Sequence, residues 1–152
     1  KVWCEKNDGS LQKIHMVSKN KLELMTLVSS KNHRNKALDS LIEKIHFKKV
    51  INMGSIGCKI ASILRGESDI YISISMPGQT CPKDWDFAAP EAILRGAGGA
   101  ITNLNNQDLI YNKNKFEQGG IIVASNNAQT HESKCARIKE IIMEFDLFPI
   151  NF

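Results

Sequence analysis

The sequence contains no apolar run of about 18 residues and no short apolar segment of the kind found in secretory signals. It therefore gives no indication of a membrane partner or of export. Lysine and arginine number 20 against 16 acidic residues, and they form no cluster interleaved with aromatic side chains. Nucleic-acid binding is disfavoured for this reason, whereas the net charge of +4 is compatible with a small anionic substrate.

Cysteine patterns that bind zinc are also absent. Cys4, Cys58, Cys81 and Cys135 lie far apart, with neither a C-x-x-C pair nor a suitable Cys/His spacing. We interpret them as reduced thiols of a cytoplasmic protein. Cys58 and Cys135 are expected to serve as small hydrophobic residues on or beside the apolar faces of helices.

The 152 residues, 42% of them hydrophobic, suffice for one domain with a core. Short apolar runs alternate with segments of helical period, which predicts an α/β domain over 1–152 with a central sheet flanked by helices. The expected strands are 24–29, 49–52, 69–75 and 119–124, with hairpins pairing 2–4 with 12–16 and 100–104 with 109–111. Helices are expected at 35–45, 56–65, about 86–97 and about 130–145. Because the chain starts abruptly, with no methionine and no lead-in to Val2, we expect it to be the later part of a longer one.

The helix after Trp85 is built mainly from small residues. Proline is tolerated best in a first helical turn, so Pro90 predicts a helix that starts at 86–88 and ends at Gly98 and Gly99. Its expected apolar face consists of Ala89, Ala92, Ile93, Gly96 and Ala97. Glu91 and Arg95 lie four residues apart on the opposite face, where an ion pair is expected.

Asp86 has two interpretations at the start of this helix. An acid there can be a first-turn residue stabilised by the helix dipole, or an N-cap at Asp84 or Asp86. Alternatively, the carboxylate of Asp86 is a metal ligand. Local chemistry leaves both open.

Two other strand-to-helix crossings carry polar residues, and ligands of α/β sheets gather at such crossings. The first is 29–34, where His33 is either an exposed capping residue or, with Ser30 and Lys31, one of a set of donors for phosphate or ribose oxygens. The second is 54–59, where Lys59 occupies the helical turn that the dipole makes unfavourable for a cation. Either a bound anion offsets that penalty or Lys59 simply extends into water.

A family resemblance rests on the segment 85–99. The run Trp85-Asp86-x-Ala-Ala-x-x-x-Ile, followed by Ala-Gly-Gly, resembles the C-terminal signature of the inositol monophosphatase superfamily of metal-dependent, lithium-sensitive phosphatases. The resemblance implies that Asp86 binds a catalytic magnesium ion. It also implies the C-terminal half of that family's layered fold, with similarity from about Leu24 to Asn126.

One branch of the superfamily is more similar than the others. Ser30-Lys31-Asn32-His33 and Gly54-Ser55-Ile56-Gly57-Cys58-Lys59 resemble segments of the CysQ-type 3'(2'),5'-bisphosphate nucleotidases, and Pro90 fits the same branch. The resemblance implies that Ser30, His33, Ser55 and Lys59 contact a nucleotide around its ribose and phosphate. The chain departs from the branch at Lys31 and Asn32, where arginine and serine are usual.

The resemblance implies an activity for the whole protein. This is magnesium-dependent hydrolysis of the 3'-phosphate of adenosine 3',5'-bisphosphate to AMP, as in sulfur assimilation. The family's upstream glutamate pair and Asp-Pro-Ile/Leu-Asp-Gly-Thr segment do not occur in these residues. We therefore expect the remaining ligands of two or more Mg²⁺ ions to lie in a missing N-terminal half, and the isolated fragment to be inactive. The alternatives are an inositol or fructose phosphate phosphatase of the same superfamily, and a non-catalytic α/β nucleotide-binding domain.

Overall fold

The computed structural model describes residues 2–31 and 35–150. Five strands form one sheet in the order β4-β3-β5-β7-β6, and two short strands form a separate hairpin. The strands are β1 (Trp3–Glu5), β2 (Leu11–Lys13), β3 (Thr26–Ser30), β4 (Lys49–Met53), β5 (Ile70–Ser75), β6 (Ala100–Asn103) and β7 (Gly120–Ser125). The helices are η1 (Leu22–Leu24), α1 (Lys36–Ile45), α2 (Ile56–Leu64), α3 (Asp84–Gly96), η2 (Asn114–Phe116) and α4 (His131–Glu144).

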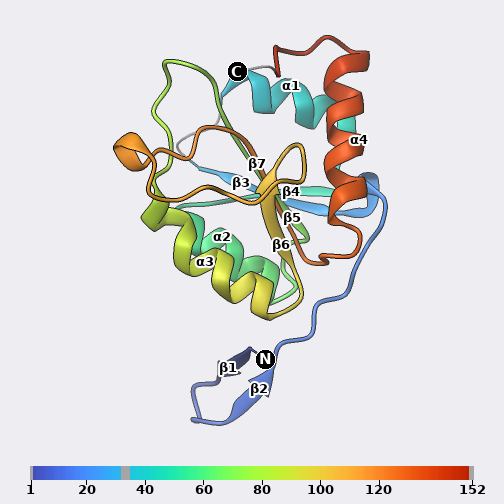
Figure 1. Ribbon diagram of the computed structural model, residues 1–152. Coiled ribbons are helices and arrows are strands. Elements are labelled where there is room, and N and C mark those ends of the chain that lie inside the picture. The colour runs from blue at the N-terminus through green and yellow to red at the C-terminus, as the bar shows by residue number, and fades with distance from the viewer. Residues whose placement is uncertain (1, 32–34, 151–152) are drawn as a thin grey trace.

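The sheet is mixed and covered by helices on both faces. Strands β4, β3 and β5 are parallel, whereas β7 runs antiparallel to both β5 and β6. Helices α1 and α4 pack on one face, and α2 and α3 on the other (Figure 1). All six residues of the central strand β5 are buried for this reason. The expected α/β class with a flanked central sheet is confirmed.

The first expected hairpin is confirmed, and the second is wrong. Strands β1 and β2 pair antiparallel, with Cys4 opposite Gln12. Strand β6, however, pairs with β7. Asn103 N–H donates to Gln107 O at 2.9 Å and closes a turn, but 109–111 forms no strand after it. Leu109 and Tyr111 instead pack their side chains against the core cluster beneath α2 and α3.

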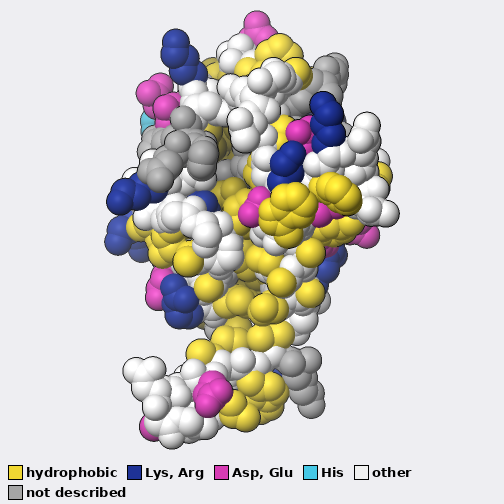
Figure 2. All heavy atoms as spheres, turned by 90° about the vertical axis from the view of Figure 1, so that its left-hand side faces the viewer, with side chains coloured by type: hydrophobic (Ala, Val, Ile, Leu, Met, Phe, Trp, Pro, Cys, Tyr) yellow, Lys and Arg dark blue, Asp and Glu magenta, His cyan; other side chains and the backbone are white. Residues whose placement is uncertain are grey.

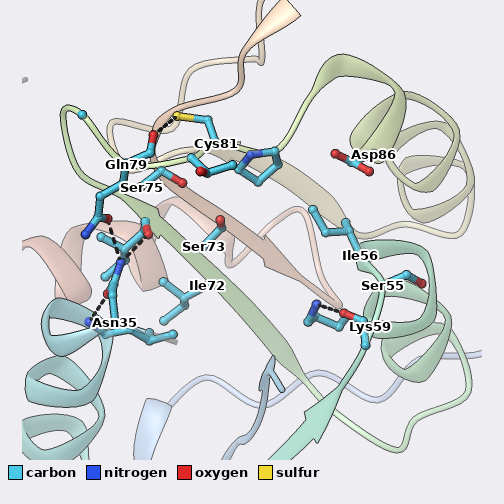
Figure 3. A pocket seen from close by; sticks show the side chains of 16 residues that line it. Asn35, Ser55, Ile56, Lys59, Ile72, Ser73, Ser75, Gln79, Cys81 and Asp86 are labelled. Carbon is cyan, nitrogen blue, oxygen red and sulfur yellow. Dashed lines mark hydrogen bonds between the residues drawn. The ribbon is translucent and has the colours of Figure 1, made fainter. Parts of the chain in front are cut away.

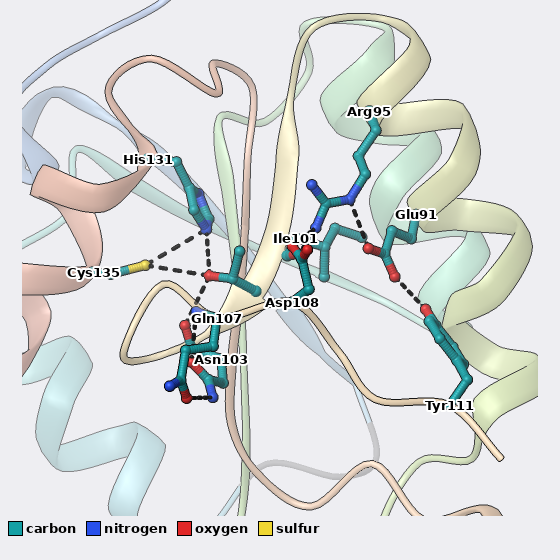
Figure 4. A network of polar contacts seen from close by, with 10 residues as sticks. Glu91, Arg95, Ile101, Asn103, Gln107, Asp108, Tyr111, His131 and Cys135 are labelled. Carbon is teal, nitrogen blue, oxygen red and sulfur yellow. Dashed lines mark hydrogen bonds and ion pairs between the residues drawn. The ribbon is translucent and has the colours of Figure 1, made fainter.

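Helix α3 differs from expectation in its start and in its buried face. It begins at Asp84, so Pro90 lies in the second turn rather than in the first. The residues it buries are Phe87, Glu91 and Leu94, whereas Ile93 of the expected apolar face is 47% exposed. Phe87 and Leu94, which are large and lie seven residues apart, decide which face of α3 turns toward the core. The expected Glu91–Arg95 ion pair is confirmed, with 2.6 Å between Arg95 Nε and Glu91 Oε1. Glu91 is nevertheless buried, and its carboxylate is satisfied by hydrogen bonds from both Arg95 and Tyr111 (Figure 4).

The glycine pair after α3 has two separate causes. Gly98 adopts a φ of +98°, which ends the helix in a conformation that suits glycine. At Gly99 an added Cβ would lie 2.6 Å from Ser125 O, so only glycine permits this approach to β7.

Two further findings concern the cysteines and the membrane. Cys135 is buried, as expected of a small hydrophobic residue on the apolar face of a helix, whereas Cys58 is exposed and does not serve that role. Within 2–31 and 35–150, no helix has the length and apolar character needed to cross a bilayer.

Candidate functional site

A cavity of about 780 Å³ opens where β3 and β5 separate (Figure 3). These strands pair only at Leu27–Ile70 and Val28–Tyr71, and the rest of β5, Ile72–Ser75, lines the cavity. The other walls come from the starts of α1, α2 and α3 and from the segment 78–82. Ligands of α/β sheets bind at such points, where neighbouring strands diverge.

Asp86 lies on the wall of this cavity, at the third position of α3. Its Oδ2 accepts a hydrogen bond from Lys83 N–H at 2.8 Å, so the carboxylate caps the first turn. Among the described residues, none donates to its Oδ1. The N-cap of α3 is Lys83, so the expected N-cap at Asp84 or Asp86 is wrong. Asp86 is a first-turn acid that bonds back to the N-cap residue through Oδ2, which leaves Oδ1 for a ligand in the cavity. Within the same part of the chain, no group of three or more His, Cys, Asp or Glu side chains is placed to hold a metal.

Lys59 lies on the opposite wall and is only 1% exposed. Its Nζ donates to Gly54 O at 2.6 Å and lies 5.3 Å from the centre of the Tyr71 ring. The interpretation in which Lys59 extends into water is wrong. Burial lowers the pKa of the Lys59 ammonium, although the charges of Cys58 and Asp86 act in the opposite direction. A buried cation at a helix N-terminus is an arrangement that can bind an anion.

Ser55 follows strand β4, and Ser30 is the last residue of β3. Ser55 is the N-cap of α2, where its Oγ accepts from Cys58 N–H at 3.1 Å, and it lines the cavity. Ser30 ends β3, is half-buried and does not line the cavity. It lies close to the phenol of Tyr71, whose pKa is raised by burial and lowered to a smaller extent by the hydroxyls of Ser73 and Ser30. His33 lies outside the described residues.

Several polar residues of the cavity were not among the sequence candidates, namely Asn35, Ser73, Ser75, Gln79 and Thr80. Ser73 and Ser75 alternate with the isoleucines of β5, and this alternation is the signal that could have identified them. Asn35 caps α1 through its Oδ1, while its Nδ2 donates to Ile74 O at 2.8 Å and to Gln79 Oε1 at 3.2 Å. These contacts join α1, β5 and the segment after β5. Because they link distant segments, no local pattern marks Asn35 or Gln79 as cavity residues.

The model of the inositol monophosphatase family matches residues 3–143. The chain belongs to this family. Curated relatives include 3'(2'),5'-bisphosphate nucleotidase 1 of Rattus norvegicus, 30% identical over 110 residues, and the nucleotidase CysQ of Buchnera aphidicola, 34% identical over 110 residues. The matches cover 71% and 72% of this chain but only 34% and 38% of the relatives. The chain thus spans about a third of their length. Inositol monophosphatase 3 of Xenopus tropicalis is 26% identical over 106 residues, covering 65% of this chain and 28% of that relative.

Solved structures of family members share the fold. The Thermotoga maritima IMPase aligns with a TM-score of 0.65 at 18% identity, over 88% of this chain and 47% of that one. The inositol monophosphatase of Anabaena (Nostoc) aligns with a TM-score of 0.61 at 20% identity, over 91% of this chain and 49% of that one. The family resemblance inferred from the Trp85-Asp86 segment is confirmed, and with it the family's fold.

Proposed function

We propose that the whole protein is a magnesium-dependent phosphatase that removes the 3'-phosphate of adenosine 3',5'-bisphosphate, giving AMP. The observation that carries the proposal is the pairing of Asp86 and the buried Lys59 on the walls of one cavity. An acid able to bind a cation and a cation able to bind a phosphate then face the same space. The curated relatives named bisphosphate nucleotidase support the choice of substrate.

The cavity has the size of a small-molecule site. Its volume of about 780 Å³ falls within the range of about 300–1,000 Å³ usual for such pockets. A phosphoryl group alone would leave most of it empty, whereas a nucleoside would occupy it. Polar side chains from α1 and β5 line it, together with apolar Leu38 and Ile72. This mixture suits the ribose and the base of a nucleotide.

Magnesium prefers oxygen ligands, and Asp86 Oδ1 is such a ligand. When bound, magnesium lowers the pKa of a water molecule and neutralises charge on phosphoryl oxygens. The chain's own residues would then orient the substrate. Lys59 and the N-terminus of α2 at Ser55 would hold a phosphate. The proposed contacts of Ser30 and His33 with the ribose rest on the family resemblance, since Ser30 does not line the cavity and His33 lies outside the described residues.

Two or more ions need more carboxylates than Asp86 supplies. We propose that a further part of the protein, corresponding to the N-terminal half of the relatives, brings them to the cavity. The face carrying α2 and α3 suits such a contact, because hydrophobic side chains gather over its middle (Figure 2). Trp85 is 67% exposed and Phe116 46%, and their rings lie 6.0 Å apart. Exposed aromatic side chains of this size favour a protein partner.

The test is Asp86→Asn in the full-length protein, assayed for magnesium-dependent release of phosphate from adenosine 3',5'-bisphosphate. Asparagine can still accept from Lys83 N–H, so the substitution removes the ligand charge and keeps the cap. We expect a loss of about a thousandfold in kcat, equivalent to about 4 kcal/mol. Asp8→Asn, in the exposed turn between β1 and β2, is the matched control. Near-normal turnover by Asp86→Asn would contradict the role of Asp86.

The same assay separates the alternatives. If the protein is instead an inositol or fructose phosphate phosphatase of the same superfamily, inositol monophosphate or fructose phosphates would be the better substrates. The relative named inositol monophosphatase 3 supports this alternative. The 152-residue chain alone is expected to be inactive, because one carboxylate does not assemble a metal cluster. If the full-length protein hydrolyses none of these substrates yet binds the nucleotide, it is a non-catalytic binding domain.

A further inference from the structure

One peptide group controls the orientation of Asp86. The N–H of the Pro82–Lys83 peptide donates to Asp86 Oδ2 at 2.8 Å. The C=O of the same peptide accepts from Gln118 N–H at 2.8 Å. Hydrogen bonds on the two sides of a peptide group polarise and align each other. The carboxylate of Asp86 is thereby linked to the position of Gln118, 32 residues further along the chain.

The side chain of Gln118 is fixed in turn. It is 2% exposed, and its Nε2 donates to Asp84 Oδ1 at 2.6 Å and to Ile110 O at 2.9 Å. Both hydrogens of the amide are therefore used. The other oxygen of Asp84 accepts from Asn112 N–H at 2.6 Å. We name this pair of side chains the Asp84/Gln118 clamp.

A second connection between the same segments is weaker. Lys83 forms a β-bridge with Glu117, and its Nζ lies 3.1 Å from Glu117 Oε1. The two side chains are 31% and 44% exposed, and ion pairs so open to solvent contribute little. The buried amide of Gln118 is therefore the contact that holds 110–118 against the start of α3.

We propose that Gln118, held by Asp84, is a positioning residue for the metal-binding carboxylate of Asp86. The metal role rests on the function proposed above. The clamp fixes the peptide that occupies Oδ2, so Oδ1 is presented to the cavity in one orientation. Groups that hold a ligand in place typically alter metal affinity by about 10–100-fold when removed.

The first experiment measures amide hydrogen exchange at Lys83. Gln118→Leu keeps the approximate size of the side chain and removes both hydrogen bonds of its amide. We expect the Lys83 N–H to exchange about tenfold faster, corresponding to the loss of about one hydrogen bond's net contribution. Gln107→Leu is the matched control, because it also removes an amide contact, to Asn103, far from Asp86. Equal Lys83 exchange in both variants would overturn the proposal.

A second set of variants, which moves the negative charge from position 84 to position 118, keeps the proposal testable if Gln118→Leu does not fold. Gln118→Glu alone places two carboxylates together and is expected to speed exchange at Lys83. Adding Asp84→Asn restores a donor between positions 84 and 118, although not to Ile110 O, and should return exchange part of the way toward the wild-type rate. Failure of this rescue would contradict a role for the clamp, because both double-variant side chains retain their size.

The second experiment measures magnesium dependence in the full-length protein. Gln118→Leu should raise the half-activating Mg²⁺ concentration at least about tenfold, while the KM for the nucleotide changes little. A purely structural residue would lower the active fraction and leave that concentration unchanged, and this result would refute the proposal. A wild-type protein without magnesium-dependent activity refutes the proposed function instead, and Lys83 exchange then still decides whether the clamp positions Asp86.

Discussion

Replacement of Lys59 by methionine tests whether the buried cation serves substrate binding rather than stability. Lys59 is 1% exposed, and burial lowers the pKa of its ammonium from 10.5. The protonated form is thus less favourable in the folded state than in the unfolded one. The free-energy cost of burying the Lys59 ammonium is present in full below its folded-state pKa and disappears as the pH rises from there to 10.5. Methionine retains the unbranched stem and removes the charge.

The expected change in the free energy of unfolding is the balance of a lost hydrogen bond and a removed cost of burying a charge. The hydrogen bond from Nζ to Gly54 O contributes about 1.5–3 kcal/mol, as bonds of charged groups do. Burial of an ammonium costs several kcal/mol. Gly54 is itself exposed, so water can replace the lost donor. We expect Lys59→Met to be neutral or to raise the free energy of unfolding by up to about 2 kcal/mol.

The assay combines urea unfolding with kinetics. Because the burial cost of the wild-type ammonium fades as the pH rises, the stability of Lys59→Met relative to wild type should decrease between pH 7 and 10. In the full-length protein, the KM for adenosine 3',5'-bisphosphate should rise about 10–100-fold, since a charged hydrogen bond to phosphate is lost. Lys36→Met, at an exposed lysine, is the control and should change neither quantity. A variant destabilised by more than about 1 kcal/mol, with unchanged KM, would refute the reasoning.

Two further predictions concern stability. His131 is 1% exposed, with Nδ1 2.7 Å from Ser125 Oγ and Nε2 2.8 Å from Thr102 Oγ1. Burial, aided by the charges of Lys134 and Arg95, lowers the pKa of His131 to about 4. Because the unfolded value is 6.5, wild type should lose up to about 3 kcal/mol as the pH falls from 6.5 to 4. Urea unfolding of His131→Gln should show a shallower slope, and an equal slope would contradict the assignment. Pro90→Ala should raise the free energy of unfolding by about 1–3 kcal/mol, because it restores the helical donor to Asp86 O. Lower stability of this variant in denaturant would mean that the packing of the proline ring outweighs the missing bond.

The order of strands and helices was predictable because each is encoded by a local pattern. Short apolar runs gave β3, β4, β5 and β7 within one or two residues of their observed bounds. The family, too, was predictable, since the residues around Asp86 are contiguous in sequence. Three of the predicted site residues, Ser55, Lys59 and Asp86, meet at one cavity because strands β4 and β5 deliver the loops before α2 and α3 to the same edge of the sheet.

Properties that depend on contacts between distant segments were not predictable. Lys59 is buried beside the Tyr71 ring of β5, and the burial of Glu91 on α3 depends on its bond to Tyr111. A helical wheel cannot foresee that an acid will be drawn inward by partners 4 and 20 residues away. The same limit applies to Gln118, because a glutamine in a polar segment carries no local sign of burial.

The two interpretations of Asp86 turn out not to compete. A carboxylate has two oxygens, and the first turn of α3 engages only Oδ2. The cap restricts the side chain to one orientation, and a ligand held in one orientation loses little conformational entropy when it binds a cation. A residue that only caps would tolerate asparagine, and a residue that only binds metal would not need Lys83 N–H. Asp86→Asn removes the charge while keeping the cap, and Gln118→Leu disturbs the cap while keeping the charge. If both roles act together, the first variant abolishes turnover and the second shifts its magnesium requirement.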